Sequence, residues 1–102
     1  MDSLEVTDAQ SAAVQKTPNR VTLESIKGKI VSEEYLHPAC LPSMTIAVLE
    51  LANGYVVTGQ AAPADPANFN EDLGRKFAYE DAVRRIWPLE GYALRERLTE
   101  AV

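Results

Sequence analysis

The sequence has few of the residues that build reactive centres. Its 102 residues include one cysteine and one histidine, and aromatic residues make up 7% of the chain. The lone Cys40 permits no internal disulfide and is typical of a protein in a reducing compartment. His37 precedes Cys40 by three positions, but two ligands alone do not make a zinc site. We therefore expect neither a bound metal nor a cofactor.

Catalytic motifs are also missing. The sequence contains no Gly-rich phosphate loop, no Gly-x-Ser-x-Gly element and no His-Glu-x-x-His. A Cys–His dyad would need an activating environment and a third orienting group, and nothing in the sequence argues for either. Adjacent carboxylates such as Glu33-Glu34 are typical of a solvated face. We expect a protein that is not an enzyme.

No charge of one sign dominates, and no long apolar run occurs. The formal net charge is −5 with 25% charged residues, which argues against attraction to nucleic acid or to anionic membranes. No stretch approaches the ~18 apolar residues of a membrane span. The first residues are acidic and lack the parts of a signal peptide. These observations predict a small soluble intracellular protein.

The clearest structural pattern is a β-hairpin. Met44–Leu51 is apolar and rich in β-branched residues, and Asn53-Gly54 separates it from Tyr55–Thr58. An Asn-Gly pair between two such runs predicts a type I′ turn, in which both central residues take positive φ. The predicted register pairs Ala52 with Tyr55 and Glu50 with Val57.

A long helix is predicted after a loop that contains Pro63 and Pro66. Asn68 has capping-box spacing to Glu71, and Asn70 is an equally good N-cap. Within Leu73–Trp87, three small residues recur at every fourth position: Gly74, Ala78 and Ala82. A glycine inside a helix costs about 1 kcal/mol relative to alanine, so this stripe predicts close packing of the helix backbone on the hairpin.

The flanking segments complete one α+β domain over residues 20–102. Residues 1–19 lack periodicity and are predicted to be a disordered tail. Thr22 is a candidate N-cap for a first helix, with Val21 and Ile26 as a hydrophobic staple. Val31–Tyr35 could finish that helix or form a third strand. Pro88 is expected to end or bend the central helix, and Ala93–Ala101 is predicted to be a final helix.

The predicted fold is therefore a small antiparallel sheet packed against a central α-helix, with shorter N- and C-terminal helices. Two strands alone do not make a stable sheet, and Met44–Leu51 looks buried on both faces while only three helices are available to cover it. We infer that a second copy of the chain supplies part of the cover. The prediction is a homodimer or a larger oligomer.

One polar constellation is a candidate binding site. It lies around the proline-containing loop and the central helix, and it includes Asn68, Phe69, Asn70, Arg75, Tyr79, Arg84, Arg85 and Trp87. Amides, aromatic faces and arginines together suit a nucleotide-like ligand, and we assign ligand binding to Asn68, Phe69, Arg84 and Arg85. Composition alone favours a plainer interpretation, in which the asparagines are caps and the arginines pair on a solvated face with Glu80 and Asp81.

Three blocks of the sequence resemble a known family. These are Leu49–Gly59, Asp65–Lys76 with its Asp-Pro-Ala-Asn-Phe start, and Ile86–Tyr92 with the sequence Ile-Trp-Pro-Leu-Glu-Gly-Tyr. They resemble the small bacteriophage proteins named after gene products forty-nine and sixty-six of two tailed phages. The resemblance covers about residues 20–98, and it implies a non-virion accessory protein located in the host cytoplasm.

The hairpin, the Asn-Phe loop and the helix are also similar to phage proteins that counter the Thoeris bacterial defence. Those proteins bind and sequester a cyclic ADP-ribose signal, and some hold cyclic oligonucleotides, in pockets of an oligomer. This resemblance implies non-enzymatic sequestration of a nucleotide-derived host immune signal. The alternative is an adaptor or inhibitor that docks on a host enzyme through its acidic surface.

Overall fold

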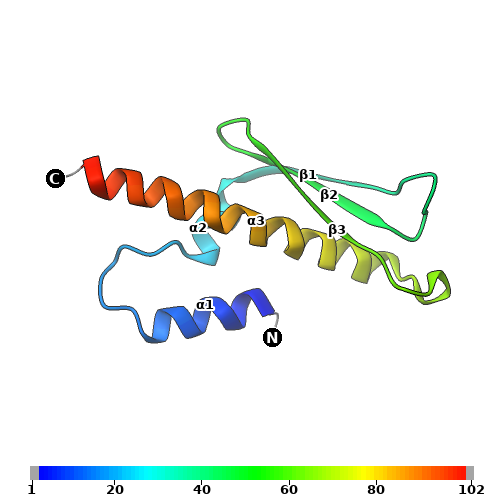
Figure 1. Cartoon of the computed structure of the whole chain (residues 1–102), viewed down its shortest axis with the longest axis horizontal. Helices are drawn as coiled ribbons and strands as arrows, with labels where there is room; N and C mark the ends of the chain where they lie inside the picture. Colours follow the sequence, from blue (N-terminus) through cyan, green and yellow to red (C-terminus); the bar gives the residue numbers. More distant parts are fainter. Residues whose placement is uncertain (1–2, 101–102) are drawn as a thin grey trace.

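The computed structural model describes residues 3–100 as a three-stranded antiparallel sheet with one long helix across one face (Figure 1). The elements in chain order are α1 (Ser3–Ala13), α2 (Leu23–Lys29), β1 (Ile30–Leu36), β2 (Thr45–Leu51), β3 (Val56–Ala61), the 3₁₀ helix η1 (Pro66–Asn68) and α3 (Glu71–Glu100). The predicted α+β class is confirmed. No described helix combines the length and hydropathy that a membrane span requires.

Strand β1 resolves the segment that the sequence left open between helix and strand. It pairs antiparallel with β2, with Glu33 opposite Leu49 and Tyr35 opposite Ala47. The strand order is β1-β2-β3, so β2 is the central strand. Three strands and a covering helix meet the usual requirement for a stable small sheet.

The β2–β3 hairpin is present, but its predicted register was wrong by one residue. Glu50 lies opposite Val56, and Leu49 lies opposite Val57. Every pair of the hairpin is therefore shifted by one position from the Glu50–Val57 pairing that a two-residue turn would impose.

The turn itself explains the shift. Leu51 N–H donates to Tyr55 O at 2.8 Å and Gly54 N–H donates to Leu51 O at 2.8 Å, so residues 52–54 form a three-residue loop. Gly54, at φ 88°, has the single positive φ among the described residues. Asn53 instead accepts a hydrogen bond from Tyr55 N–H on its side-chain oxygen at 3.0 Å. One positive φ fits a three-residue hairpin loop rather than type I′.

Close contact between helix and sheet occurs at two glycines. Gly59 of β3 lies so near α3 that an added Cβ would stand 2.3 Å from Ala78 O and 2.3 Å from Ala82 N. A Cβ on Gly74 of α3 would stand 2.6 Å from Thr45 Oγ1 of β2. The predicted packing of the small-residue stripe on the hairpin is confirmed.

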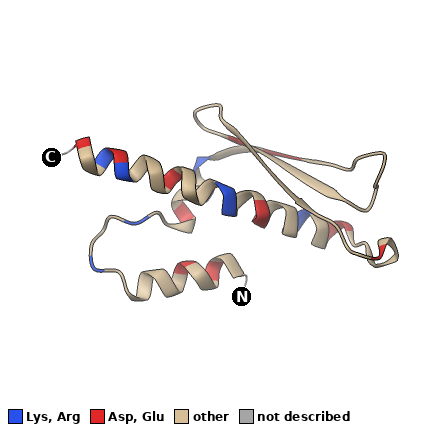
Figure 2. Ribbon diagram, in the orientation of Figure 1, with Lys and Arg blue, Asp and Glu red and all other residues tan. Residues whose placement is uncertain are grey.

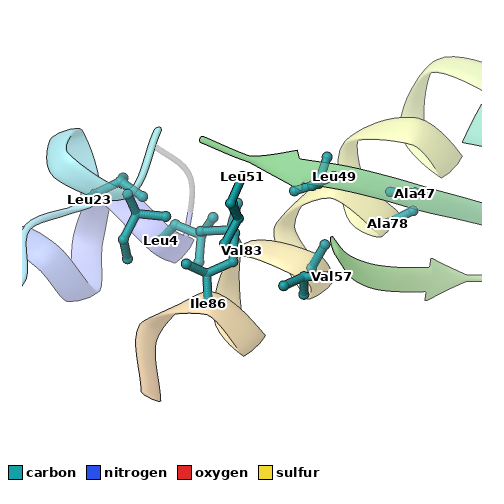
Figure 3. Close-up of a cluster of buried hydrophobic side chains, with 11 residues drawn as sticks. Leu4, Leu23, Ala47, Leu49, Leu51, Val57, Ala78, Val83 and Ile86 are labelled. Carbon is teal, nitrogen blue, oxygen red and sulfur yellow. The ribbon is translucent and has the colours of Figure 1, made fainter. Parts of the chain in front are cut away.

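The core lies between the sheet, α3 and the two N-terminal helices (Figure 3). Ile26, Leu49, Val83 and Ile86 are the largest apolar side chains that are fully buried. Along β2 the burial alternates, with Thr45, Ala47, Leu49 and Leu51 on the helix side buried. The opposite face of β2 is only partly covered within this chain, so the strand is not buried on both faces.

The N-terminal segment differs from the predicted disordered tail, because residues 3–13 form α1. Leu4 inserts into the core and is 6% exposed. The Asp8 carboxylate pairs with Arg20 at 2.7 Å and accepts a hydrogen bond from Leu23 N–H at 3.2 Å. A single buried leucine and one capping carboxylate produce no periodic pattern, which is why the sequence did not reveal them. Residues 1 and 2 lie outside the described part.

Helix α2 begins where the sequence predicted. Thr22 is its N-cap, and Ser25 completes a capping box: Ser25 N–H donates to Thr22 Oγ1 at 3.0 Å and Thr22 N–H donates to Ser25 Oγ at 3.2 Å. Val21 packs against the core that contains buried Ile26, as expected for the residues of a hydrophobic staple.

Helix α3 runs without a break through Pro88, so the prediction of a separate final helix from Ala93 was wrong. Ala101, its predicted end, lies outside the described residues. A proline inside a helix removes one backbone hydrogen bond and costs about 3 kcal/mol. Buried Ile86 before the proline and the ion pair between Lys29 and Glu90 after it hold both sides of α3 on the domain, which offsets that cost.

The Gly59 contact predicts a large effect of a small substitution. Gly59→Ala should destabilise the protein by about 1–3 kcal/mol, as expected for overpacking against helix backbone that cannot move away. The matched control is Gly91→Ala, because a Cβ at Gly91 of α3 meets nothing within 4 Å, and it should stabilise by up to about 1 kcal/mol. Urea unfolding measures both, and equal free energies for the two variants would contradict the predicted contact.

Candidate ligand-binding site

A cavity of about 220 Å³ lies where the end of β3 meets the start of α3. Its walls are mostly apolar and come from the end of β3, the following loop and the first turns of α3: Ala61, Ala62, Pro63, Asn68, Phe69, Asn70, Leu73, Gly74 and Phe77. We call this cavity the β3–α3 pocket. Leu73 and Phe77 at its rim are 48% and 49% exposed. Because they are four positions apart on α3, they form one exposed apolar surface.

The loop before α3 shapes this pocket through two local caps. Asp65 caps η1 by accepting a hydrogen bond from Ala67 N–H at 2.9 Å. Asn70 caps α3 by accepting from Leu73 N–H at 3.0 Å. Asn70 is therefore the N-cap of α3, and the alternative prediction of Asn68 was wrong. Asn68 is exposed beside the pocket, where its amide plays no part in capping.

The structure brings two of the four predicted ligand residues together. Asn68 and Phe69 line the same pocket. Arg84 follows Gly74 by ten positions on α3, which corresponds to about 15 Å along the helix. Within one chain, Arg84 and Arg85 therefore do not face the ligand space that Asn68 and Phe69 border.

Both arginines have local partners. Arg84 donates to Ser3 Oγ at 2.6 Å, and Glu80, its predicted partner, is buried at 7% exposure. Arg85 pairs with Asp81 at 3.2 Å as predicted. The same Asp81 oxygen, Oδ2, accepts from Gln60 N–H at 2.9 Å and so ties the edge of β3 to α3. Trp87, also in the predicted constellation, packs against the core.

A cluster around His37 was missed by the sequence reasoning. The His37 Nδ1 atom lies 2.8 Å from Met44 O, and Nε2 lies 3.0 Å from Glu71 Oε1. The ring packs edge-to-face on Phe69 at a centroid distance of 5.8 Å. The sequence separates His37 from Glu71 by 34 positions, and they meet only because β1 pairs with β2 and α3 packs on the sheet.

The His37 cluster continues toward β1. Arg75 Nε donates to the same Glu71 oxygen at 3.0 Å, and its guanidinium lies 5.2 Å from the ring centre of Tyr35. The Tyr35 hydroxyl donates to Glu33 Oε1 at 3.2 Å. Burial, with a contribution from the nearby Glu33 charge, raises the pKa of Tyr35 to about 12. Tyr35 therefore stays a neutral donor at all physiological pH values.

Metal-ligating, thiol and charged side chains are spread over the described residues. Within residues 3–100, no group of three or more His, Cys, Asp or Glu side chains is arranged to hold a metal ion. Cys40 is exposed and lies in the loop between β1 and β2. Acidic and basic residues alternate along α3 (Figure 2), so the long helix does not present a charge of one sign.

Comparison with known sequences identifies the family. The sequence model of the Phage protein (N4 Gp49/phage Sf6 gene 66) family matches residues 21–98. The chain belongs to this family. The match begins at the residue before the N-cap of α2 and ends two residues before the end of α3, so it includes the sheet and the β3–α3 pocket of this Gp49/gene 66 protein. Neither the curated proteins nor the solved structures gave a match.

The His37–Glu71 contact predicts a pH dependence of stability. Hydrogen bonds to Met44 O and to Glu71 raise the pKa of His37 above its ordinary 6.5, and hydrogen bonds from His37 and Arg75 lower the pKa of Glu71 below its ordinary 4.5. The His37 contribution is therefore fully present below pH 6.5 and is lost as pH rises through the folded pKa. The Glu71 contribution is present above pH 4.5 and is lost as pH falls through its folded pKa.

The measurement is the melting temperature of the native protein and of His37→Gln across this range. The native protein should exceed the variant most between about pH 5 and 6, and the difference should shrink above the folded pKa of His37. A difference that is constant from pH 5 to 9 would contradict a contribution from the charged imidazole.

Proposed function

We propose that this Gp49/gene 66 protein is a non-enzymatic phage accessory protein that counters host defence by sequestering a nucleotide-derived signal of the cyclic ADP-ribose or cyclic oligonucleotide type. The observation that supports this best is the β3–α3 pocket, where Phe69 and Phe77 offer aromatic faces and the exposed Asn68 offers an amide. Aromatic faces stack on planar bases, and an amide can donate and accept along a base edge.

The pocket's size sets how such a ligand would be held. Its 220 Å³ lies below the roughly 300–1,000 Å³ of pockets that enclose a whole drug-sized ligand. It suits one ring system, with the remainder of the ligand outside the pocket. That remainder carries phosphates, which arginine guanidinium groups bind well. Because Arg84 and Arg85 are remote within one chain, they would have to reach this ligand from a second copy.

The free face of the sheet supports the proposal of an oligomer. Residues opposite one another on this face include Leu36 and Ile46, and Val56 lies on it as well. Leu36 is 46% and Val56 is 51% exposed, so an apolar stripe crosses the face that α3 does not cover. A second copy that packs on this stripe would bury apolar surface and would form a cleft that one chain lacks.

Ligand titration tests the pocket. Calorimetry with cyclic ADP-ribose isomers and cyclic di- and trinucleotides should detect binding of at least one of them, and the bound ligand should be recovered intact after denaturation. Phe77→Ala should weaken that binding by about tenfold, the effect of losing a base–aromatic stack of roughly 1–3 kcal/mol. Tyr92→Ala is the matched control, since Tyr92 is a 71% exposed aromatic on the same helix outside the pocket.

The absence of heat and of thermal shift with every compound would contradict nucleotide sequestration, and so would a chemically altered ligand. A host protein captured by the ligand-free form, in the same experiment, would instead support the adaptor interpretation.

Light scattering after gel filtration tests the oligomer. The native chain should elute as a dimer or larger species, and Val56→Lys together with Leu36→Lys should shift it toward the 11.2 kDa monomer, because charges on a packed apolar face oppose association. Glu96→Lys, an exposed change near the end of α3, controls for net charge. A native protein that is monomeric at all concentrations would contradict the proposed cleft between copies.

A further inference from the structure

His37 lies at the point where three separate segments of the chain meet. It follows β1, and its ring nitrogens face the Met44 carbonyl just before β2 and the Glu71 carboxylate in the first turn of α3. Its ring edge also meets Phe69, which directly precedes the N-cap Asn70. A second link between the end of β1 and the start of α3 is the Arg75 guanidinium over the Tyr35 ring.

The two acceptors around His37 decide which protonation state of the imidazole fits this arrangement. A backbone carbonyl and a carboxylate are both acceptors only, and a neutral imidazole has one N–H donor. A neutral ring can therefore satisfy Met44 O or Glu71 but not both, and its second nitrogen then faces another acceptor. The doubly protonated ring donates to both partners, so an imidazolium satisfies the contacts at 2.8 and 3.0 Å and a neutral ring does not.

Phe69 connects the His37 ring with the β3–α3 pocket. The Phe69 ring lines the β3–α3 pocket and also an open groove of about 470 Å³ formed with Leu41, Pro42, Ser43 and Pro66. It is the one residue that lines both of these spaces among those described. Its position therefore decides whether the pocket and the groove are two spaces or one.

We propose that His37 is a proton-dependent positioning residue for the pocket: its imidazolium form ties β1, the loop before β2 and α3 together and holds Phe69 as the wall between pocket and groove, and loss of the proton releases that wall. This role requires the pocket that the proposed function uses, but it does not depend on which ligand fills it. It gives the site a geometry that changes near neutral pH.

The charges that face His37 from each neighbouring element favour this role. From α3, Glu71 contacts the ring and Arg75 shares the same Glu71 oxygen. From β1, the Tyr35 ring lies under Arg75, and its hydroxyl donates a hydrogen bond to Glu33. Arg75 opposes the positive charge of the ring, whereas the Met44 carbonyl and the Glu71 carboxylate favour it.

Proton NMR on the full ligand-free chain tests the proposal, because a single histidine gives one imidazole resonance pair without ambiguity. Between pH 5.5 and 8.5, the Phe69 ring shifts should change with the same midpoint as the His37 resonances, and the cross-relaxation between the two rings should weaken as the proton leaves. Glu71→Gln removes the charge but keeps a side-chain oxygen, and it should move both midpoints downward together. Glu96→Gln, on the same helix, should move neither.

Phe69 shifts that stay flat while His37 titrates would overturn the proposal. So would a Glu71→Gln protein in which the His37 midpoint moves and the Phe69 transition does not follow. His37→Phe keeps an aromatic ring at this position without a titrating proton, and its Phe69 resonances should be independent of pH. None of these measurements uses a nucleotide, so a failure here is distinct from a failure of the ligand titration.

Discussion

The structure depends on one close approach, that of the α3 backbone to β3 at Gly59. The side chains that allow it are all small: Gly59 on the strand, and Ala78 and Ala82 on the helix. Because no Cβ separates the two backbones here, α3 lies directly on the sheet, and the larger residues Val83 and Ile86 pack further along, where α2 and α1 close the core. The direction of α3 is fixed by this contact, and the first turn of the helix is carried with it to the end of β3.

That placement creates the unusual surfaces of the molecule. A helix that lies over β2 and β3 leaves the helix-side face of β1 partly open, where Tyr35 and Tyr79 border a polar hollow with Arg75. It also leaves the other face of the sheet only partly covered by residues 3–100. At the start of α3, the close contact of Gly74 with Thr45 places the helix near the sheet. The loop before α3 passes around this contact, and the space beside Phe69 is the β3–α3 pocket. Pocket and packing therefore have the same cause.

The parts of this fold that could be predicted from the sequence are those with local physical causes. The Thr22 cap, the hairpin, the long helix and the small-residue stripe each leave a recognisable pattern within a few residues. The errors came where two local rules competed. Asn53-Gly54 allows both a two-residue and a three-residue turn, and the three-residue loop needs positive φ at Gly54 alone. Pro88 is a helix breaker by propensity, but tertiary contacts on both sides of it keep α3 continuous.

The candidate site was harder to predict for the same reason. Asn68 and Phe69 are neighbours in sequence, and a motif that includes both can be read directly. Arg84 and Arg85 lie on the helix that borders the pocket, but the helix rise separates them from it. Arg85 is also paired with Asp81, whose carboxylate accepts a hydrogen bond from the edge of β3. His37 lies in a proline-containing loop with no pattern around it, and its partners Met44, Phe69 and Glu71 come from segments that only the folded sheet brings together.

The proposed sequestration of a ligand places its demands on geometry. A protein that holds a ligand without turning it over needs walls that keep their positions, since every side chain that must be ordered on binding costs about 0.5–1.5 kcal/mol. Phe69 is ordered in advance by its contacts with His37 on one side and with the helix start on the other. Glu71, which contacts His37, also accepts a hydrogen bond from Arg75, and the Arg75 guanidinium lies over the Tyr35 ring, so the preorganisation reaches from β1 to the pocket. The few polar residues that this chain buries or pairs near α3 act on the shape of the pocket, and in the proposed function that shape would select the ligand.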